Sequence, residues 1–350
     1  MAVFPKRMNE FDFINKIKER ARQQQSSSGL VQGIGDDAAV LKSLTSSDLV
    51  ISTDMLVEDV DFRRETTRPE LVGHKALAVS LSDIAAMGAR PRWALLSLGV
   101  PAAVWGDDVL DSFYDGFFRL AKRYGVTLIG GDVSRTPDKV VLDSILIGET
   151  PKTGAIFRSG ARPGDQIFVT GFLGDAAAGL RLLEHGARLQ SPTIAEDSQD
   201  NSNESRPIDY LLLRHLQPEP RVGWGLLLGE QQLATAMIDI SDGLSSDLKH
   251  LCDESGVGAL VEASQVPIDP LVTELSGRRA LDPLMLALHG GEDFELLFTV
   301  RPDMVARLPK RVDGISLTRI GEIKEAGAGV QISEGSRTWK LEPGGWEHFK

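Results

Sequence analysis

The sequence predicts a protein of the α+β or α/β class, with two domains built from interleaved helices and strands. Three observations lead to this prediction. The chain of 350 residues is longer than one average domain. Strand and helix patterns occur in both halves with long spacing between them, which argues against an all-β sandwich. Residues 149–165 are rich in glycine, proline and charge, and we place the boundary between domains 1–150 and 151–350 there.

The N-terminal domain is expected to alternate helices and strands. Phe11, Ile14 and Ile17 recur at helical spacing and predict a first helix over residues 10–25, followed by a polar loop. Further helices are expected over residues 73–87, where Gly88 stops a run of small residues, and over the amphipathic stretch 107–124. Strands are expected over residues 49–53, ending on Asp54, and over 93–101, 126–132 and 140–148; the third of these ends in a glycine turn and an acid.

The C-terminal domain is expected to show the same mixture. A strand at residues 165–171 precedes a helix at 174–186 that has glycine at both ends. A strand at 235–240 runs into an acidic turn, a helix starts at about residue 244, and a strand at 294–300 precedes several short strands. Residues 192–207 are polar and of low complexity, which predicts a flexible insertion with no role in chemistry.

The composition excludes several classes of protein. Hydrophobic residues make up 42% and charged residues 25% of the chain, as in ordinary globular proteins. No stretch approaches the roughly 18 apolar residues of a membrane span, and the N-terminus lacks an apolar signal region, so a cytoplasmic protein without membrane contact is expected. The net charge of −12 argues against nucleic acid as a partner. Cys252 is the only cysteine, which excludes intrachain disulfides and cysteine-based zinc sites.

Acidic residues recur beside glycine or hydroxyl residues at the edges of apolar elements. The segments are GIGDD (33–37), STD (52–54), GGD (130–132), DISDG (239–243) and GGED (290–293), and Asp83 lies inside an apolar helix. Turn and cap preferences explain any one of them. Carboxylates gathered without a cation would repel one another, and oxygen ligands of this kind suit magnesium or calcium. Because magnesium commonly bridges to substrate phosphates, the set indicates nucleotide phosphate chemistry.

The segment GIGDDAAV at residues 33–40 has the glycine spacing of a phosphate-binding loop, yet it carries Asp36 and Asp37. It fits the loose dinucleotide pattern G-x-G-x-x-A, but no clear strand is expected before it. The chain contains no G-x-x-x-x-G-K-[ST] loop and no protein-kinase motif set. Phosphates are therefore expected to be held through metal bridges and glycine amides. Spacing alone does not decide whether Asp36 or Asp37 meets the metal.

The ordered motifs resemble those of the thiamine-monophosphate kinase family, in the aminoimidazole ribonucleotide synthetase-like superfamily. They are GIGDDAAV, ISTDMLVEDVDF, HKALAVSLSDIAAMGARP, LIGGD, FRSGARPGD, IDISDGLSSDL, GGEDFELLF and GGWEHF. The resemblance covers residues 10–349 and implies ATP-dependent phosphorylation of thiamine monophosphate to thiamine diphosphate. It also implies an α+β fold of two domains and a homodimer. The sheet of the N-terminal α+β domain would pair across the dimer, and the C-terminal domain would be α/β.

Carried over by motif, the resemblance assigns site residues. Ligands of several Mg²⁺ ions would be Asp37, Ser52, Thr53, Asp54, Asp83, Asp132, Asp239 and Asp242. Asp54, Asp83 and Asp132 are expected to form the metal core. Contacts to ATP would come from Gly131, Asp132, Arg158, Ser241 and, by position on its helix, Tyr114. Glu292 and Trp346 would contact thiamine monophosphate.

Asp61 is a departure from the family pattern, which has a histidine before the phenylalanine as a substrate contact. An ionised aspartate cannot donate a hydrogen bond to a phosphate. Asp61 is carried over as a substrate residue that faces the cationic thiazolium or a metal, or turns away. Other residues have ordinary structural interpretations: Arg158 as a solvated side chain, Trp346 and Cys252 as packing residues, and His74 as a cap or packing residue.

The expected reaction is direct in-line transfer of the γ-phosphoryl group of ATP to the acceptor phosphate. No catalytic base is assigned, because a phosphate monoester with a second pKa of about 6 is already ionised. Two other functions stay open. One is another ATP-dependent synthetase of the superfamily. The other is a non-enzymatic ATP-binding maturation or scaffold protein, against which the C-terminal WEHFK, with no cysteine, counts.

Overall fold

The computed structural model describes the chain except residues 1–17, 19–28, 44–46, 191–206, 280–281 and 348–350. The helix predicted over residues 10–25, apart from Lys18, lies outside the described residues, as does the polar insertion apart from Pro207. Among the described helices, none has both the length and the apolar composition needed to cross a bilayer.

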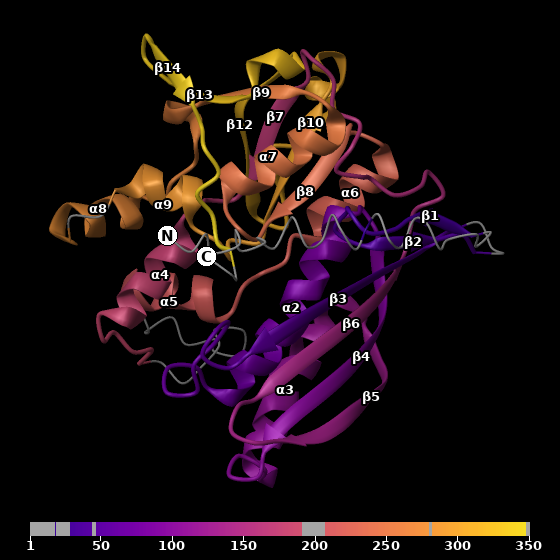
Figure 1. Ribbon diagram of the computed structural model, residues 1–350, viewed down its shortest axis with the longest axis vertical. Helices are drawn as coiled ribbons and strands as arrows, with labels where there is room; N and C mark the ends of the chain where they lie inside the picture. Colours follow the sequence, from indigo (N-terminus) through magenta and orange to yellow (C-terminus); the bar gives the residue numbers. More distant parts are fainter. Residues whose placement is uncertain (1–17, 19–28, 44–46, 191–206, 280–281, 348–350) are drawn as a thin grey trace, which may run out of the picture.

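The first sheet has six strands in the order β1-β2-β3-β6-β4-β5 (Figure 1). Its strands are β1 (Leu30–Gln32), β2 (Ala39–Leu41), β3 (Leu49–Val57), β4 (Arg90–Pro101), β5 (Thr127–Thr136) and β6 (Val141–Glu149). Neighbours are antiparallel except β4 and β5. A short strand thus precedes residues 33–37, contrary to expectation, but strand β2 follows them, not the helix of a dinucleotide-binding loop.

Two helices cover one face of this sheet. Helix α2 (Pro69–Ala86) packs against β3 and β6, and α3 (Asp107–Tyr124) packs against α2. Pro69 stands in the first turn, where its missing N–H is tolerated, so α2 begins four residues before the predicted helix. The two helices approach closely because Gly73 and Gly116 face the partner backbone: a Cβ at either would lie 1.8 Å from a carbonyl oxygen. Helix α3 has the predicted bounds.

The second sheet follows the path β14-β13-β9-β12-β7-β10-β8, and β11 pairs with β12. Its strands are β7 (Gln166–Thr170), β8 (Ala236–Ile240), β9 (Gly258–Glu262), β10 (Glu295–Val300), β11 (Arg311–Val312), β12 (Ile315–Lys324), β13 (Val330–Glu334) and β14 (Arg337–Lys340). The helices of this half are α4 (Asp175–Glu184), α5 (Pro207–Leu216), α6 (Val222–Gln231), α7 (Leu244–Ser255), α8 (Pro270–Arg279) and α9 (Pro283–His289). The predicted mixed α+β fold is confirmed, and its strands form two main sheets in the part of the chain that the structure describes.

Two predicted strand ends are wrong. Strand β3 continues to Val57, so Asp54 lies within the strand, opposite Ser144 of β6. Strand β5 continues to Thr136, so Asp132 lies opposite Ser97 of β4, not in a turn. The reason is that ladder hydrogen bonds to a long neighbour extend a strand through polar residues. Gly131 permits this pairing, since a Cβ there would lie 2.0 Å from the oxygen of Leu96.

Helix α2 joins the two halves. Besides β3 and β6 it packs against α6, β8 and β10, and in Figure 1 it lies between the two sheets. All but three of its residues are buried. The largest apolar core accordingly extends from α2 and α3 into the second half, where it includes Trp224 and Phe298. Polar side chains on α2 are therefore held at the junction of the two halves.

Candidate metal and phosphate site

Three aspartates from distant segments meet at this junction. Asp37 precedes β2, Asp83 lies on α2 and Asp239 lies on β8. One carboxylate oxygen from each lies within 4.8 Å of the other two, an arrangement that could hold a metal ion. We call these residues the acid cluster. It contains Asp83 of the expected metal core, joined by Asp37 and Asp239 in place of Asp54 and Asp132.

Hydroxyl groups support the carboxylates of the acid cluster and of Asp54. Ser82 donates to Asp239 at 2.6 Å, and Ser80 donates to Asp54 at 2.7 Å. Ser52 donates to Asp83 and, at 3.4 Å, to Asp54. Ser52 thereby links Asp54 of the first sheet to the acid cluster, while Ser80 and Ser82 come from the same helix as Asp83.

Burial and mutual repulsion raise the pKa values of these acids. Burial, followed by the charges of Asp54, Asp239 and Asp37, raises the pKa of Asp83 well above its usual value. Burial and the charge of Asp37 raise the pKa of Asp239 to about 8. Burial also raises the pKa of Asp54. Ionised together at neutral pH, these groups need a compensating cation.

Asp37 offers a free ligand atom. Its Oδ1 accepts a hydrogen bond from Nη2 of Arg158 at 2.7 Å. Its Oδ2 is buried and accepts no hydrogen bond from any residue that the structure describes. A buried carboxylate oxygen without a donor is suited to a metal ion. This orphaned oxygen is an independent sign that the acid cluster fits a cation.

Asp36 plays a different part from Asp37. Its carboxylate accepts hydrogen bonds from the backbone N–H of Arg158 at 3.2 Å and from that of Asp37 at 3.0 Å. Burial and then the charge of Asp37 raise its pKa to about 7. Asp36 therefore ties the turn at residues 33–37 to the Arg158 backbone, while the Arg158 side chain meets Asp37. Arg158 is not a solvated surface residue: its side chain is 25% exposed.

The remaining predicted metal ligands lie outside the acid cluster. Thr53 donates to Asp143 at 2.7 Å. Asp132 is exposed on β5. The backbone N–H of Asp242, in the turn after β8, donates to Asp247 at 3.2 Å. Burial and the charges of Asp242 and Asp239 raise the pKa of Asp247 well above its usual value.

Two predicted nucleotide residues have structural contacts of their own. Tyr114 stacks on Phe118, with ring centroids 5.6 Å apart, on α3. The carbonyl of Ser241 accepts a hydrogen bond from the backbone N–H of Glu292 at 2.7 Å. The turn after β8 is thus joined to the segment that carries Glu292, a predicted contact to thiamine monophosphate.

The predicted acceptor residues differ in exposure and contacts. Glu292 forms ion pairs with Lys75 at 2.6 Å and with His215 at 2.9 Å. Burial would raise its pKa, but Lys75 and His215 outweigh that effect and lower the pKa to about 2. Asp61 lies in the turn after β3, and its carboxylate accepts a hydrogen bond from the backbone N–H of Val57, the last residue of that strand, at 2.7 Å. Trp346 is 55% exposed, and its backbone N–H donates to the backbone carbonyl oxygen of Asp242 at 3.1 Å. Trp346 is therefore not a core residue.

Sequence reasoning missed several residues around these acids: Lys75, Ser80, Ser82, Asp143, His215 and Asp247. The first three had a signal, because a lysine and two serines inside an apolar helical run must find partners when buried. Asp247 lies in the motif IDISDGLSSDL, but the resemblance assigned it no role, and His215 lies in a segment with no pattern that points to it. His74, as predicted, packs: it is buried in α2 with Nε2 2.8 Å from the oxygen of Pro218, and burial lowers its pKa to about 4.

Known proteins resemble the whole chain. Residues 35–150 match the N-terminal domain, and residues 162–332 the C-terminal domain, of AIR synthase related proteins. The thiamine-monophosphate kinase of Bacillus subtilis (strain 168) is 39% identical over 346 residues, 98% of this chain and 100% of the relative. That of Escherichia coli (strain K12) is 39% identical over 345 residues, 97% and 98% of the two chains. A solved structure of AaThiL complexed with AMPPCP and TMP aligns with a TM-score of 0.82 and 33% identity over 100% of both chains.

Proposed function

The chain belongs to the thiamine-monophosphate kinase family of AIR synthase related proteins, and from this premise we propose that it transfers the γ-phosphoryl group of ATP to thiamine monophosphate, giving thiamine diphosphate and ADP. The observation that carries the proposal is the full-length likeness to AaThiL, which was solved with AMPPCP and TMP bound. The acid cluster supplies the chemistry that such a transfer needs. ATP as a co-substrate also supports the expected cytoplasmic location.

The reaction is an in-line displacement between two phosphates. The acceptor phosphate has a second pKa of about 6 and is ionised at neutral pH, so no general base is needed. The difficulty is that two anions must approach each other. Positioning and charge neutralisation therefore carry the rate. A site of fixed carboxylates, a cation and one arginine suits this task better than a site built around a base.

Magnesium is the cation that fits the site. The acid cluster offers only oxygen ligands, and Oδ2 of Asp37 is buried without a donor. Held by Asp37, Asp83 and Asp239, magnesium would offset the carboxylate charges and neutralise the charge of the phosphates. Arg158 orients Asp37 through its guanidinium, and Ser52 and Ser82 orient Asp83 and Asp239. These residues hold the ligand oxygens in place before any substrate arrives.

The site assignments extend those of the sequence. We propose metal ligands among Asp37, Ser52, Thr53, Asp54, Asp83, Asp132, Asp239 and Asp242, with the acid cluster as their centre. Gly131, Asp132, Arg158, Ser241 and Tyr114 would contact ATP. Glu292 and Trp346 would contact thiamine monophosphate, Glu292 through its fixed negative charge. The carboxylate of Asp61 turns back toward Val57, which favours an indirect contribution of this residue. The domain boundary stays at residues 150 and 151.

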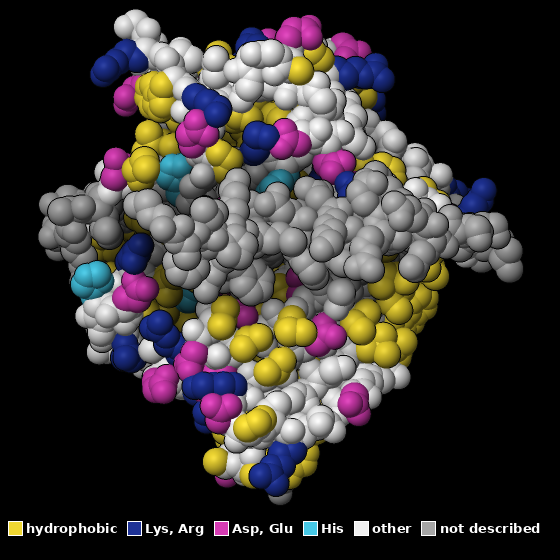
Figure 2. Space-filling view, viewed as in Figure 1, with side chains coloured by type: hydrophobic (Ala, Val, Ile, Leu, Met, Phe, Trp, Pro, Cys, Tyr) yellow, Lys and Arg dark blue, Asp and Glu magenta, His cyan; other side chains and the backbone are white. Residues whose placement is uncertain are grey.

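We further propose a homodimer formed through the open face of the first sheet. Its other face packs against α2, yet Met55 and Ile129 are 61% and 54% exposed. Figure 2 shows hydrophobic side chains gathered over the strands of this sheet. Strand β5 is also an edge strand, whose free backbone groups favour pairing with another chain. A second copy of the chain would cover both features.

Placing charges on this face is expected to convert the dimer to a monomer. In the variant Met55→Asp/Ile129→Asp, two buried charges would oppose association, while exposed positions change folding stability by only about 0.5 kcal/mol or less each. Light scattering after size-exclusion chromatography reports the mass. Met285→Asp, at a 49% exposed position on α9, is the matched control and should stay dimeric. A monomeric native protein, or a dimeric double variant, would contradict the proposed interface.

Purified protein with ATP, magnesium and thiamine monophosphate is expected to form thiamine diphosphate and ADP in equal amounts. Chromatographic quantification of both products measures the reaction. Chelation of magnesium with EDTA should abolish turnover, and added magnesium should restore it, because the acid cluster carries uncompensated charge without a cation. Turnover of a different phosphorylated acceptor, with none of thiamine monophosphate, would reject the substrate assignment. Activity in full under EDTA would reject the metal requirement.

A further inference from the structure

Lys75 is a buried cation in the apolar helix α2. Its side chain is 2% exposed, and the residues three and four positions away on the helix are Leu71, Val72, Ala78 and Val79. A buried ammonium group is stable only when it is paired. Lys75 lies on the same helix as Asp83 of the acid cluster, two turns earlier, but it does not take part in that cluster. Its partners show what it does.

The ammonium group of Lys75 joins two segments that carry predicted acceptor residues. Its Nζ lies 2.6 Å from Oε1 of Glu292 and donates to the backbone oxygen of Asp61 at 2.9 Å. Glu292 belongs to the second half of the chain and Asp61 to the first. The side chain of Glu292 is 29% exposed, so it is not closed off from a ligand. Lys75 therefore fixes Glu292 from behind.

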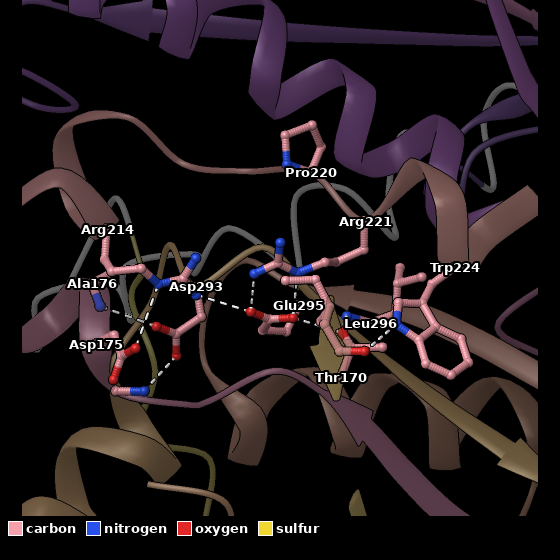
Figure 3. A network of polar contacts seen from close by, with 12 residues as sticks. Thr170, Asp175, Ala176, Arg214, Pro220, Arg221, Trp224, Asp293, Glu295 and Leu296 are labelled. Atoms are coloured by element: carbon pink, nitrogen blue, oxygen red, sulfur yellow. Dashed lines mark hydrogen bonds and ion pairs between the residues drawn. The ribbon is translucent and has the colours of Figure 1, made fainter. Parts of the chain in front are cut away.

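The other oxygen of Glu292 is held by a second residue. Oε2 of Glu292 lies 2.9 Å from Nδ1 of His215, at the end of α5. Arg214, the preceding residue, pairs with Glu295 at 2.9 Å in the buried network of Figure 3. Arg221 and Thr170 bind the same Glu295 carboxylate, at 2.6 and 2.7 Å to Oε2. The end of α5 is thus fixed independently of Glu292.

The backbone around Glu292 is itself constrained. Glu292 and Phe294 have φ values of 66° and 50°, which non-glycine residues rarely adopt. A Cβ at Gly291 would lie 2.7 Å from the oxygen of Ser241, so this segment presses against the turn after β8. Strain of this kind persists only where surrounding contacts enforce it. Lys75 and His215 provide two such contacts.

We propose that Lys75 is a positioning residue for acceptor recognition: it holds the carboxylate of Glu292 in place toward the cationic part of thiamine monophosphate, and His215 completes the clamp. This inference rests on the proposed function, in which Glu292 contacts the acceptor. Lys75 itself touches neither the acceptor nor the transferred phosphoryl group. The fixed carboxylate selects for an acceptor that carries a positive charge. It attracts a cationic acceptor, gives a neutral one no such attraction and repels an anionic one.

A double-mutant cycle tests the role. Lys75→Met keeps the length of the side chain and removes the charge. It is expected to raise the KM for thiamine monophosphate by about tenfold or more, with the KM for ATP changed by no more than about twofold. Glu292→Gln should have a similar effect. In the Glu292→Gln background, Lys75→Met should add little, since both changes remove one interaction.

A second lysine provides the control for Lys75→Met. Lys249→Met removes an exposed lysine paired with Asp253 on α7 and should leave both KM values unchanged. The role of Lys75 would be refuted if Lys75→Met left the KM for thiamine monophosphate unchanged. It would also be refuted if the double variant raised this KM by the product of the two single effects. If Lys75 had only a structural role, Lys75→Met would lower the melting temperature and the fraction of active protein. It would not raise the KM for thiamine monophosphate more than the KM for ATP.

His215→Gln provides a second variant, needed should Lys75→Met fail to fold. It removes the contact to Oε2 and should also raise the acceptor KM, and an unchanged value would reject the clamp. The native protein separates this inference from the function on which it rests. If it phosphorylates thiamine monophosphate while the variants keep their KM, only the clamp is wrong. If it does not use this acceptor, the proposed function is wrong and the clamp falls with it.

Discussion

Asp83→Asn is expected to lower kcat by roughly a thousandfold or more, because it removes a carboxylate from the centre of the acid cluster and several kcal/mol of charge stabilisation with it. The side chain keeps its shape and can still bond to Ser52. Steady-state kinetics at saturating magnesium measures the loss. Activity close to that of the native protein would remove Asp83 from the metal site.

The fold of this variant should survive. Because folding raises the pKa of Asp83, its charge costs free energy at neutral pH when no cation is bound. Without magnesium, Asp83→Asn should therefore melt at the same temperature as the native protein or higher, and it should gain less when magnesium is added. Asp59→Asn, at an exposed acid paired with Lys139, is the control and should keep both activity and the magnesium effect.

Glu295→Gln is expected to lower the free energy of unfolding by about 3–5 kcal/mol, the usual result of breaking a buried ion pair from one side. Glu295 is 0% exposed and binds Arg214 and Arg221, so the substitution leaves the buried Arg221 without this anion and Arg214 with Asp175 alone as an ion-pair partner (Figure 3). Urea denaturation measures the change. A loss below about 1 kcal/mol would show that the network tolerates the missing charge.

The pH dependence of this loss has a definite sign. Burial opposes ionisation of Glu295, but Arg221 and Arg214 outweigh it and lower its pKa below 4.5. The stabilisation is therefore fully present above pH 4.5 and is lost as the pH falls through the lowered value. The difference between native and variant should shrink in that acidic range. Glu184→Gln, in an exposed pair with Arg181 on α4, should cost no more than about 0.5 kcal/mol at any pH.

The sequence predicted the main elements well because their patterns are local. Helix α3 was found with its bounds because its amphipathic repeat and the glycines at its ends act over a few residues. Strands β3 and β5 were predicted too short because their ends depend on pairing with β6 and β4, which no local pattern contains. Asp54, Gly131 and Asp132, which looked like strand ends, are held inside these ladders.

The acid cluster was predictable in part. The motifs indicated that Asp37, Asp83 and Asp239 share a function, but their meeting at the junction is a property of the fold. The motifs favoured a metal core of Asp54, Asp83 and Asp132. In the fold, the carboxylates closest to Asp83 in the acid cluster are those of Asp37 and Asp239. The separate parts of Asp36 and Asp37 could not be predicted, because they depend on how the two carboxylates face Arg158.

Lys75 and His215 were missed for a related reason. A lone lysine in an apolar helix signals only that a partner exists. The partner, Glu292, lies in the other half of the chain, so the sequence could not name it. Nothing in the sequence points to His215, because a histidine near the end of a helix of ten residues is ordinary.

Helix α2 contributes a residue both to the acid cluster and to the clamp of Lys75 and His215 on Glu292, and both lie between the two halves of the chain. Asp83 and Lys75 belong to this single rigid element, whereas Asp239 and Glu292 belong to the second half. Any relative displacement of the halves would break both clusters together, and closing one would close the other. A ligand that stabilises the closed form of one cluster therefore reduces the free-energy cost of ordering the other. Thermodynamic linkage then requires that nucleotide with its cation and the acceptor strengthen each other's binding by the same factor.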